Sequence, residues 1–507
     1  MNVLFSQHLP NLTKISVGLM KCIQHFACRL RRCFFSRTSF RVYLIGATLI
    51  CLTYLSLRWY GRHALEAEKE RVSALGLATD WNQLTKPMPA EEENFLAAPP
   101  FAEVFATPYP VAPKVALWLA NRQITTLRPN GRIRYTTART PSDNTLAAWC
   151  EYFRKIGALP SPPVNESPAA ELLADEKMRA IIKSILEAAQ RPYSRFPIPP
   201  AHGPYEIYER MRPEVMNSMM RCLQLYARAQ LETGHPEEAI PVFRVTHHVA
   251  SAFASEPSVL THIYTGSTVR LQKTLLRAGI VAHAWPADFL RSYLEDNYPA
   301  LLQKSGRRAF EGDRLIMSGR FEHYRSTLLP LRNAPLSQVI LWEYLAPNYY
   351  YVNAAVRCSQ YYAGIHAAAE PLEPQESWAS RTPGFPAMRP TYGPVGTFYL
   401  EYDPKDFLLG SHVYPIIQAT LQHLAAALEL HYLTRGRYPM ALDELNPASS
   451  VPFLPLKDID GQTIRYITDA FGSHFTLISV GADGLLDSPP NGSDDIVFST
   501  DPQRKAN

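Results

Sequence analysis

Apolar residues recur every three to four positions through much of the middle of the chain, the spacing of helices with one buried face. The segment from Pro213 to Glu232 illustrates the pattern, with a stripe made of Val215, Met219, Cys222, Leu223 and Tyr226. Gly234, His235 and Pro236 interrupt it, and a second stripe follows to about Ala254. The same spacing predicts further helices over residues 169–190, 260–278, 287–293, 336–345 and 352–369.

The segment 226–250 resembles a tetratricopeptide hairpin. The features that carry this resemblance are small residues at Ala227 and Ala229, a Gly-Pro turn, and Glu238 and Ala239 at the start of the second helix. The match covers one hairpin, and no clean period of about 34 residues is visible. The helical patterns therefore predict a helical-hairpin domain over residues 115–370 rather than a regular solenoid, and such domains usually bind proteins or brace assemblies.

The pattern changes after residue 413. A helix rich in Ala and Leu ends at Gly436, a typical C-cap residue, with Pro439 just beyond it. Asp460-Gly461 then signals a turn, and alternating apolar residues predict strands near 464–468, 474–480 and 495–500. We therefore expect a small α+β domain over residues 413–507.

This C-terminal order resembles the globular part of the type II secretion major pseudopilin, over residues 421–498. The residues that carry the resemblance are Gly436-Arg437-Tyr438-Pro439, Leu442, Leu445, Asp458 through Gly461, Tyr466, Ser479 through Gly484, and Asp495-Ile496. The remainder of the chain looks like uncharacterised membrane-anchored helical proteins of bacteria. The resemblance implies a pseudopilin-like domain at the end of a helical protein.

In that family the corresponding loop binds calcium, an ion that takes six to eight oxygen ligands. The resemblance implies Ca²⁺ ligands at Asp483 and Asp495, to which Asp487, Asp494 and Ser479 add oxygens. Clustered carboxylates repel one another, and a divalent ion offsets that repulsion. Ordinary Asp-Gly turn chemistry with solvated charges is the alternative.

The N-terminus predicts a membrane anchor. Residues 1–41 hold seven Lys or Arg and no Asp or Glu, and residues 42–57 carry no charge. With Trp59 and Tyr60 as an interfacial belt, residues 42–60 are expected to form one transmembrane helix. The basic flank places the N-terminus in the cytoplasm and the rest of the chain across a bacterial inner membrane. A cleaved signal peptide and a buried core helix are the alternatives.

Proline clusters and cysteines complete the expected organisation. Residues 61–114 predict a helical stalk and a Pro-rich linker, and residues 371–412 predict a second Pro-rich linker. The exported part holds only Cys150, Cys222 and Cys358, so the sequence predicts no disulfide framework. Outside residues 1–41 the charge is almost balanced, at 44 basic and 46 acidic residues, so we expect no nucleic-acid partner.

The sequence contains none of the common hydrolase or nucleotide-binding motifs. We therefore expect a structural or interaction protein that is not an enzyme, with partners in the cell envelope and a link to a type II secretion or pilus-like system. No small-molecule substrate is indicated. One alternative is an envelope hydrolase, whose site would bring together His247, His248 and His262. The other is a ligand sensor that uses clustered tyrosines, among them Tyr361 and Tyr362.

Overall fold

The protein is described by a computed structural model, and its chain divides into two compact units. One unit comprises residues 1–70 and 320–356, and the other comprises residues 71–319 and 357–507. The structure describes residues 25, 37–85, 87–99, 101–106, 125–127, 133–135, 145–155, 159, 167–197, 211, 213–326, 347–370, 408–445, 458, 462–480 and 495–501.

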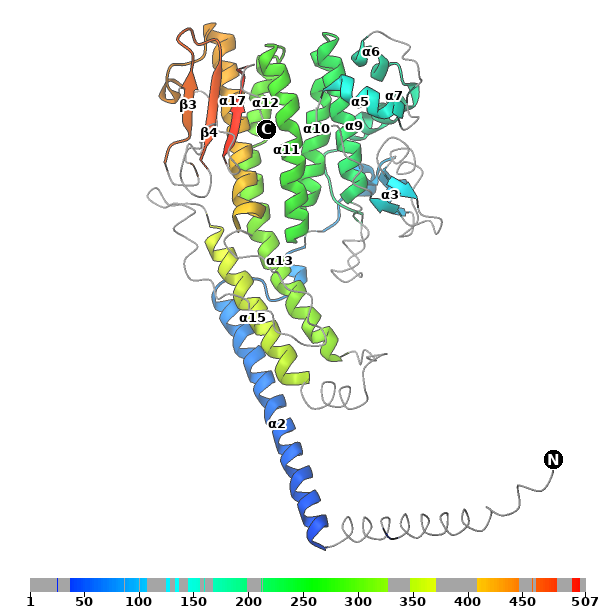
Figure 1. Cartoon of the computed structure of the whole chain (residues 1–507), viewed down its shortest axis with the longest axis vertical. Helices are drawn as coiled ribbons and strands as arrows, with labels where there is room; N and C mark the ends of the chain where they lie inside the picture. Colours follow the sequence, from blue (N-terminus) through cyan, green and yellow to red (C-terminus); the bar gives the residue numbers. More distant parts are fainter. Residues whose placement is uncertain are drawn as a thin grey trace, which may run out of the picture. The chain divides into compact units, whose positions relative to one another are not determined.

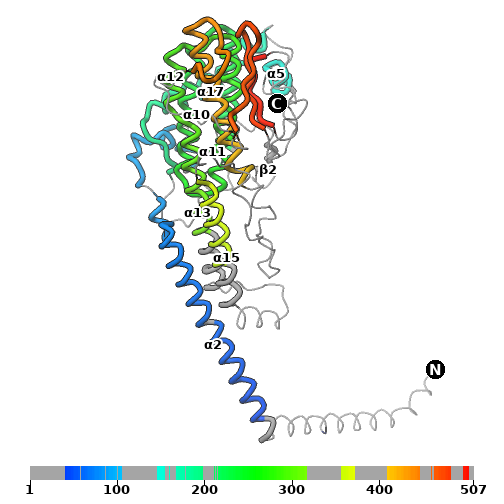
Figure 2. The backbone as a smooth tube through the Cα atoms, turned by 90° about the vertical axis from the view of Figure 1, so that its left-hand side faces the viewer, coloured from blue at the N-terminus to red at the C-terminus, as the bar shows by residue number. Residues whose placement is uncertain are grey.

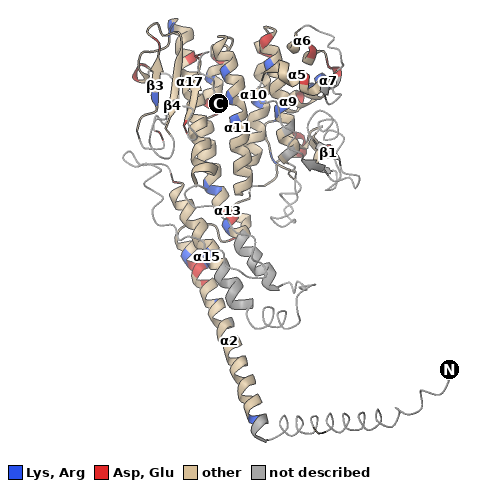
Figure 3. Cartoon of the chain, in the orientation of Figure 1, with Lys and Arg blue, Asp and Glu red and all other residues tan. Residues whose placement is uncertain are grey.

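The first unit holds most of one long helix, α2, which runs from Arg37 to Ala74. Its segment Phe40–Ala74 is long and apolar enough to cross a membrane by length and composition. Large side chains along it, including Phe40 and Trp59, are exposed in the protein. Figure 3 shows that much of α2 carries no Lys, Arg, Asp or Glu. These features are those of the predicted N-terminal apolar helix.

The second unit is mainly helical, and the predicted mainly helical chain is thereby confirmed in its coarse form. Short 3-10 turns occur at Trp81–Gln83, Glu91–Glu93, Phe95–Ala97 and Leu442–Glu444, and a π-helix, η6, spans Leu409–Val413. The helices are α3 (Phe101–Ala106), α5 (Leu146–Lys155), α6 (Pro168–Leu173), α7 (Glu176–Ala188), α9 (Pro213–Glu232), α10 (Pro236–Ser255), α11 (Val259–Val281), α12 (Ala287–Glu295) and α17 (Tyr414–Arg435). Helices α13 (Tyr298–Ser326) and α15 (Pro347–Ala368) have residues in both units.

Helices α9 and α10 form the predicted hairpin, and its turn depends on glycine. Gly234 has φ 81°, a left-handed conformation that costs other residues free energy. Pro236 then opens α10 at a position where its missing N–H costs nothing. Helix α11 packs against both helices of the hairpin, and α17 packs against α11 and α12 (Figures 1 and 2). Helix α11 therefore lies at the centre of the helical layer.

A three-stranded antiparallel sheet lies beside α17, close to the C-terminus (Figure 1). Its strands are β3 (Arg465–Thr468), β4 (Phe475–Ser479) and β5 (Ile496–Ser499), in the order β3-β4-β5. Pairing aligns Tyr466 with Leu477 and Ile478 with Val497. The segment that follows α17 packs on the sheet, since the ring centroids of Tyr438 and Phe475 lie 4.8 Å apart. A separate pair, β1 (Thr125–Leu127) and β2 (Ile133–Tyr135), is also antiparallel.

Local chemistry explains where the helices differ from the predictions. The helix expected over 169–190 is two helices, because the Asp175 side chain accepts the Met178 amide and caps a new start. Helix α13 was not predicted, because its many charged and polar residues interrupt the apolar stripe. The helix expected over 336–345 lies outside the described residues.

Candidate functional site

The predicted metal site is only partly within the described residues. Asp483, Asp487 and Asp494 lie outside them, whereas Ser479 ends β4 and Asp495 directly precedes β5. Ser479 pairs with Ile496, so Ser479 and Asp495 stand at the adjoining ends of neighbouring strands. Strand pairing therefore brings Ser479 and Asp495, the two described members of the predicted set, close together.

The buried carboxylate of Asp458, the first residue of the Asp458–Gly461 run, lies beside Ser479. The Ser479 hydroxyl donates to Asp458 Oδ1, and the Val480 amide donates to Oδ2 over 2.7 Å. Both carboxylate oxygens thus accept hydrogen bonds from protein groups at the base of the aspartate loop. Within the described ranges, no three His, Cys, Asp or Glu side chains gather as a metal site. The described donors fit a hydrogen-bonded loop anchor, and the calcium ligands remain a prediction.

The three histidines proposed for a hydrolase have different partners. His247 lies 3.5 Å from the Asp296 carboxylate. His248 Nε2 lies 3.1 Å from the Ala189 carbonyl oxygen, and its ring stacks on Phe95. Burial lowers the pKa of His248 to about 4, so this ring is neutral at physiological pH. His248 is therefore part of the packing between α10 and its neighbours.

His262 belongs to a buried chain of hydrogen bonds. Its Nδ1 lies 2.9 Å from Ser305 Oγ, and its Nε2 lies 3.2 Å from Nδ1 of His412. Because the Ser305 hydroxyl donates to the Leu302 carbonyl, it accepts from His262, and His262 Nε2 accepts from His412. Gly306 permits this approach, since an added Cβ would lie 2.9 Å from His262 Nε2.

Burial determines what this Ser305–His262–His412 chain can do. All three side chains are at most 3% exposed. Burial lowers the pKa of His262 to about 4 and lowers the pKa of His412 well below its ordinary value. Two neutral rings sealed from water join α11, α13 and η6, and they offer no surface to a substrate. Sequence could not pair His262 with His412, because 150 residues separate them.

A second buried carboxylate links α17 to the turn between α11 and α12. Glu429 is fully buried, and its two oxygens accept from Tyr438 over 2.6 Å and from His283 over 2.9 Å. The His283 ring also stacks on Tyr432 at 4.1 Å. His283 has φ 49°, an unusual backbone conformation for a side chain of this size. We call the set His283, Glu429, Tyr432 and Tyr438 the α17 clasp.

Burial raises the pKa of Glu429, and hydrogen bonds from Tyr438 and His283 oppose that rise. Tyr438 belongs to the Gly-Arg-Tyr-Pro run at 436–439, and its backbone amide donates to the Gly472 carbonyl over 2.9 Å. Tyr438 therefore connects α17 to both the α11–α12 turn and the β3–β4 hairpin.

A third polar network crosses the helical layer. Gln272 Nε2 donates to the Tyr298 hydroxyl over 2.9 Å, and the Tyr293 hydroxyl lies within 3.4 Å of amide oxygens of Gln272 and Gln422. The ring of His423 lies 5.2 Å from that of Tyr293. These groups come from α11, α12, α13 and α17, so the network fixes the mutual register of four helices.

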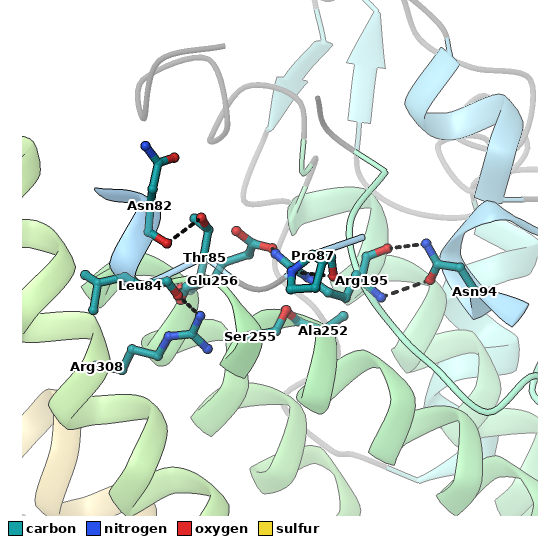
Figure 4. Close-up of polar contacts among 11 residues, drawn as sticks. Asn82, Leu84, Thr85, Pro87, Asn94, Arg195, Ala252, Ser255, Glu256 and Arg308 are labelled. Atoms are coloured by element: carbon teal, nitrogen blue, oxygen red, sulfur yellow. Dashed lines mark hydrogen bonds and ion pairs between the residues drawn. The ribbon is translucent and has the colours of Figure 1, made fainter. Parts of the chain in front are cut away.

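The segment after α2 is clamped to the helices by arginines (Figure 4). We call residues 77–98 the strap. Arg314 donates to the Ala78 carbonyl, Arg308 donates to the Leu84 carbonyl, and Arg195 donates to the Pro87 carbonyl over 3.3 Å. The 3-10 turns of the strap satisfy some of its carbonyl groups, and the guanidinium groups satisfy these three.

Arg195 is the centre of this clamp (Figure 4). It forms an ion pair of 3.0 Å with Glu256, and the two side chains are 11% and 8% exposed. Its backbone amide and carbonyl pair with the Asn94 side chain at 2.9 Å each. Phe95 and Leu96, which follow, are fully buried. The strap is thus part of the core of the second unit.

The tyrosine cluster proposed for a sensor is also occupied by packing where it is described. Tyr361 and Tyr362 are buried and meet edge to face at 5.3 Å. The side chains of Tyr349, Tyr350 and Tyr351 lie outside the described residues.

Comparison with known proteins gives no relative. No protein-family model, no curated protein and no solved structure matches this chain. Its function must therefore be argued from its own residues.

Proposed function

We propose that this chain is a single-pass protein of the bacterial inner membrane, with a cytoplasmic N-terminus and a helical body on the other side. There it serves as a structural or interaction component of the cell envelope, linked to a type II secretion or pilus-like system. The observation that carries the proposal is the passage from an apolar helix of membrane-spanning length into a strap clamped to the body. Such a junction suits an anchor that holds a folded body at a membrane.

The polar clusters support a bracing role. The Ser305–His262–His412 chain, the α17 clasp and the strap arginines each join elements that are distant in sequence. Buried hydrogen-bonded networks of this kind favour one arrangement of helices. A protein that braces an assembly needs that rigidity, whereas catalysis needs reactive groups within reach of a substrate.

The finer fold assignment is part of the same proposal. Helices α9 and α10 are consistent with a tetratricopeptide-like hairpin, and the order α17, β3, β4, β5 is consistent with a pseudopilin-like C-terminal domain. The part played by Tyr438 supports the second assignment, because a residue of the Gly-Arg-Tyr-Pro run connects the helix to the sheet.

Membrane topology provides the first test. Full-length protein is expected in the inner-membrane fraction, and fusions of alkaline phosphatase are expected to be active after residue 300 and inactive before residue 36. A matched chain with Leu49 and Leu52 replaced by arginine should lose both membrane retention and phosphatase activity. Soluble full-length protein, or activity only at the N-terminal fusion, would overturn the anchor or its orientation.

Crosslinking in cells tests the proposed role. Photoreactive residues at exposed positions of the body, such as Tyr193 and Phe471, should trap envelope proteins of a secretion or pilus-like system. The same residue at the buried position Phe253 should trap nothing. Adducts with unrelated soluble proteins alone would argue against an envelope assembly.

We also propose that the aspartate loop, with Asp483, Asp487, Asp494, Asp495 and Ser479, binds Ca²⁺. The adjoining positions of Ser479 and Asp495 support this. Calcium at 100 times its dissociation constant would stabilise the folded chain by about 2.7 kcal/mol. Thermal unfolding of full-length protein should show a calcium-dependent rise that Asp495→Asn removes and Asp443→Asn keeps. Equal unfolding midpoints in calcium and chelator would refute the site.

A further inference from the structure

Strand β3 is at the edge of its sheet, and no described strand pairs with its outer side. The Asp469 amide donates to the His474 carbonyl over 3.3 Å, which directs the backbone groups of position 469 toward β4. By the alternation of antiparallel ladders, positions 465 and 467 also face β4. The backbone groups of Tyr466 and Thr468 therefore face outward, where a further strand would bind them.

One face of this edge strand carries a distinctive order of side chains. Arg465 and Ile467 share one face of β3, because side chains alternate along a strand. Asp469 directly follows the strand, and its carboxylate also accepts the Ser473 amide over 2.6 Å. Ile467 is 44% exposed. Within the described residues, Arg465 forms no ion pair. An apolar residue is thus flanked by a cation and an anion, each two positions away.

We propose that two copies of this chain pair through their β3 edges, antiparallel, about a twofold axis at Ile467. Ile467 then lies opposite its own copy, and Arg465 lies opposite Asp469 of the second copy, twice. Tyr466 and Thr468 of one copy exchange backbone hydrogen bonds with Thr468 and Tyr466 of the other. The two sheets become one of six strands.

The charge order selects a second copy over a foreign strand. Read in the opposite direction, the order cation, apolar, anion is complementary to itself. A register centred on Tyr466 would place Arg465 opposite Ile467, and one centred on Thr468 would place Ile467 opposite Asp469. Only the register centred on Ile467 places each arginine opposite an aspartate and Ile467 opposite an apolar residue. The other registers place a charged side chain opposite Ile467, which is a less favourable cross-strand pair. The proposal does not depend on the membrane anchor or on the envelope role.

Register-specific crosslinking of the full chain tests this arrangement. All native cysteines are first replaced, and single cysteines are then introduced. In a pair without backbone hydrogen bonds, opposite Cα atoms lie about 4.5 Å apart, within reach of a disulfide. Oxidised Ile467→Cys should therefore give a disulfide-linked dimer. Arg465→Cys should not link to itself, but a mixture of Arg465→Cys and Asp469→Cys chains should form mixed dimers.

Two outcomes of that experiment would overturn the proposal. One is an Ile467→Cys chain that stays monomeric under oxidation. The other is an Arg465→Cys chain that dimerises as efficiently as Ile467→Cys, since that result would mean random collision or another register. Either result would mean that the β3 edge binds a strand from another protein or binds no strand at all.

Charge pairing at the twofold position gives an independent test. Ile467→Lys or Ile467→Glu is added to both the Arg465→Cys and the Asp469→Cys chains, which places like charges opposite each other at position 467. With the same substitution in both chains, the yield of the 465–469 disulfide should fall at least tenfold below that of the chains with Ile467. A mixture of an Ile467→Lys chain with an Ile467→Glu chain should recover the yield through mixed pairs. Because Ile467 is exposed, both variants should fold, as circular dichroism would show. An undiminished yield with Ile467→Lys in both chains would contradict the pairing.

Discussion

Replacing Gly312 with alanine tests how closely α13 packs on the turn between α10 and α11. In an open helix interior, Gly to Ala stabilises a protein by about 1 kcal/mol, because alanine restricts the unfolded chain and favours the helix. At Gly312 an added Cβ would lie 2.6 Å from the Pro257 carbonyl carbon and closer still to its oxygen. Carbon atoms in contact lie about 3.5 Å apart.

The clash involves backbone, so no side chain can rotate away to relieve it. Helix α13 and the turn must separate by about 1 Å, if carbon contacts of about 3.5 Å are to be restored. That separation disturbs the bond from the Val259 amide to Asp313, which spans 3.3 Å. Overpacking of this kind costs about 1–3 kcal/mol, so Gly312→Ala should destabilise the protein despite its helix propensity.

The assay is urea unfolding of the full chain in detergent, followed by circular dichroism. Gly410→Ala is the matched control, because its added Cβ would have no atom within 4 Å. Gly312→Ala should lower the free energy of unfolding, whereas Gly410→Ala should raise it or leave it unchanged. A Gly312→Ala protein as stable as the parent would refute the close packing of α13 on this turn.

Substitutions at three further residues test the polar clusters. Tyr438→Phe removes a hydrogen bond to the buried Glu429 carboxylate and should cost about 1.5–3 kcal/mol in urea unfolding, with faster amide exchange in the β3–β4 hairpin; unchanged exchange there would count against the clasp. Arg195→Ala removes the guanidinium that pairs with the buried Glu256 carboxylate, so it should cost about 3–5 kcal/mol and expose the strap to proteases. Arg195→Lys keeps the positive charge and should cost less. Equal losses for both would contradict a stabilising ion pair between Arg195 and Glu256. Burial lowers the pKa of His423 to about 4, so its neutral form favours folding above pH 6.5, and that stability is lost as pH falls toward 4. His423→Phe should flatten this acid dependence by up to about 1.4 kcal/mol per pH unit, and an unchanged slope would contradict the assignment.

Much of the helical layer was accessible from the sequence. The stripe of α9 is buried as predicted, because a 3.6-residue period with few breaks specifies which face meets the core. Gly436 closes α17 with φ 73°, as its type and the following Pro439 indicated. These features depend on residues near one another in the chain.

The polar clusters were not accessible, because each joins residues far apart in sequence. Glu429 and His283 are separated by 146 positions, and Leu84 and Arg308 by 224. Nothing local distinguishes Arg308 from a solvated arginine, since its role appears only when the strap crosses α13. The strap itself was expected to be a linker from its prolines, yet Phe95 and Leu96 belong to the core.

The central position of α11 has a consequence for synthesis. Helix α11 ends at Val281, whereas its neighbour α17 begins only at Tyr414. At usual rates of translation the ribosome takes on the order of ten seconds to cover that interval. During it, the side of α11 that α17 will cover faces solvent, and Gly266 lacks its neighbour Pro415 of α17. The nascent chain therefore passes through a period of exposure that ends only when α17 has been made.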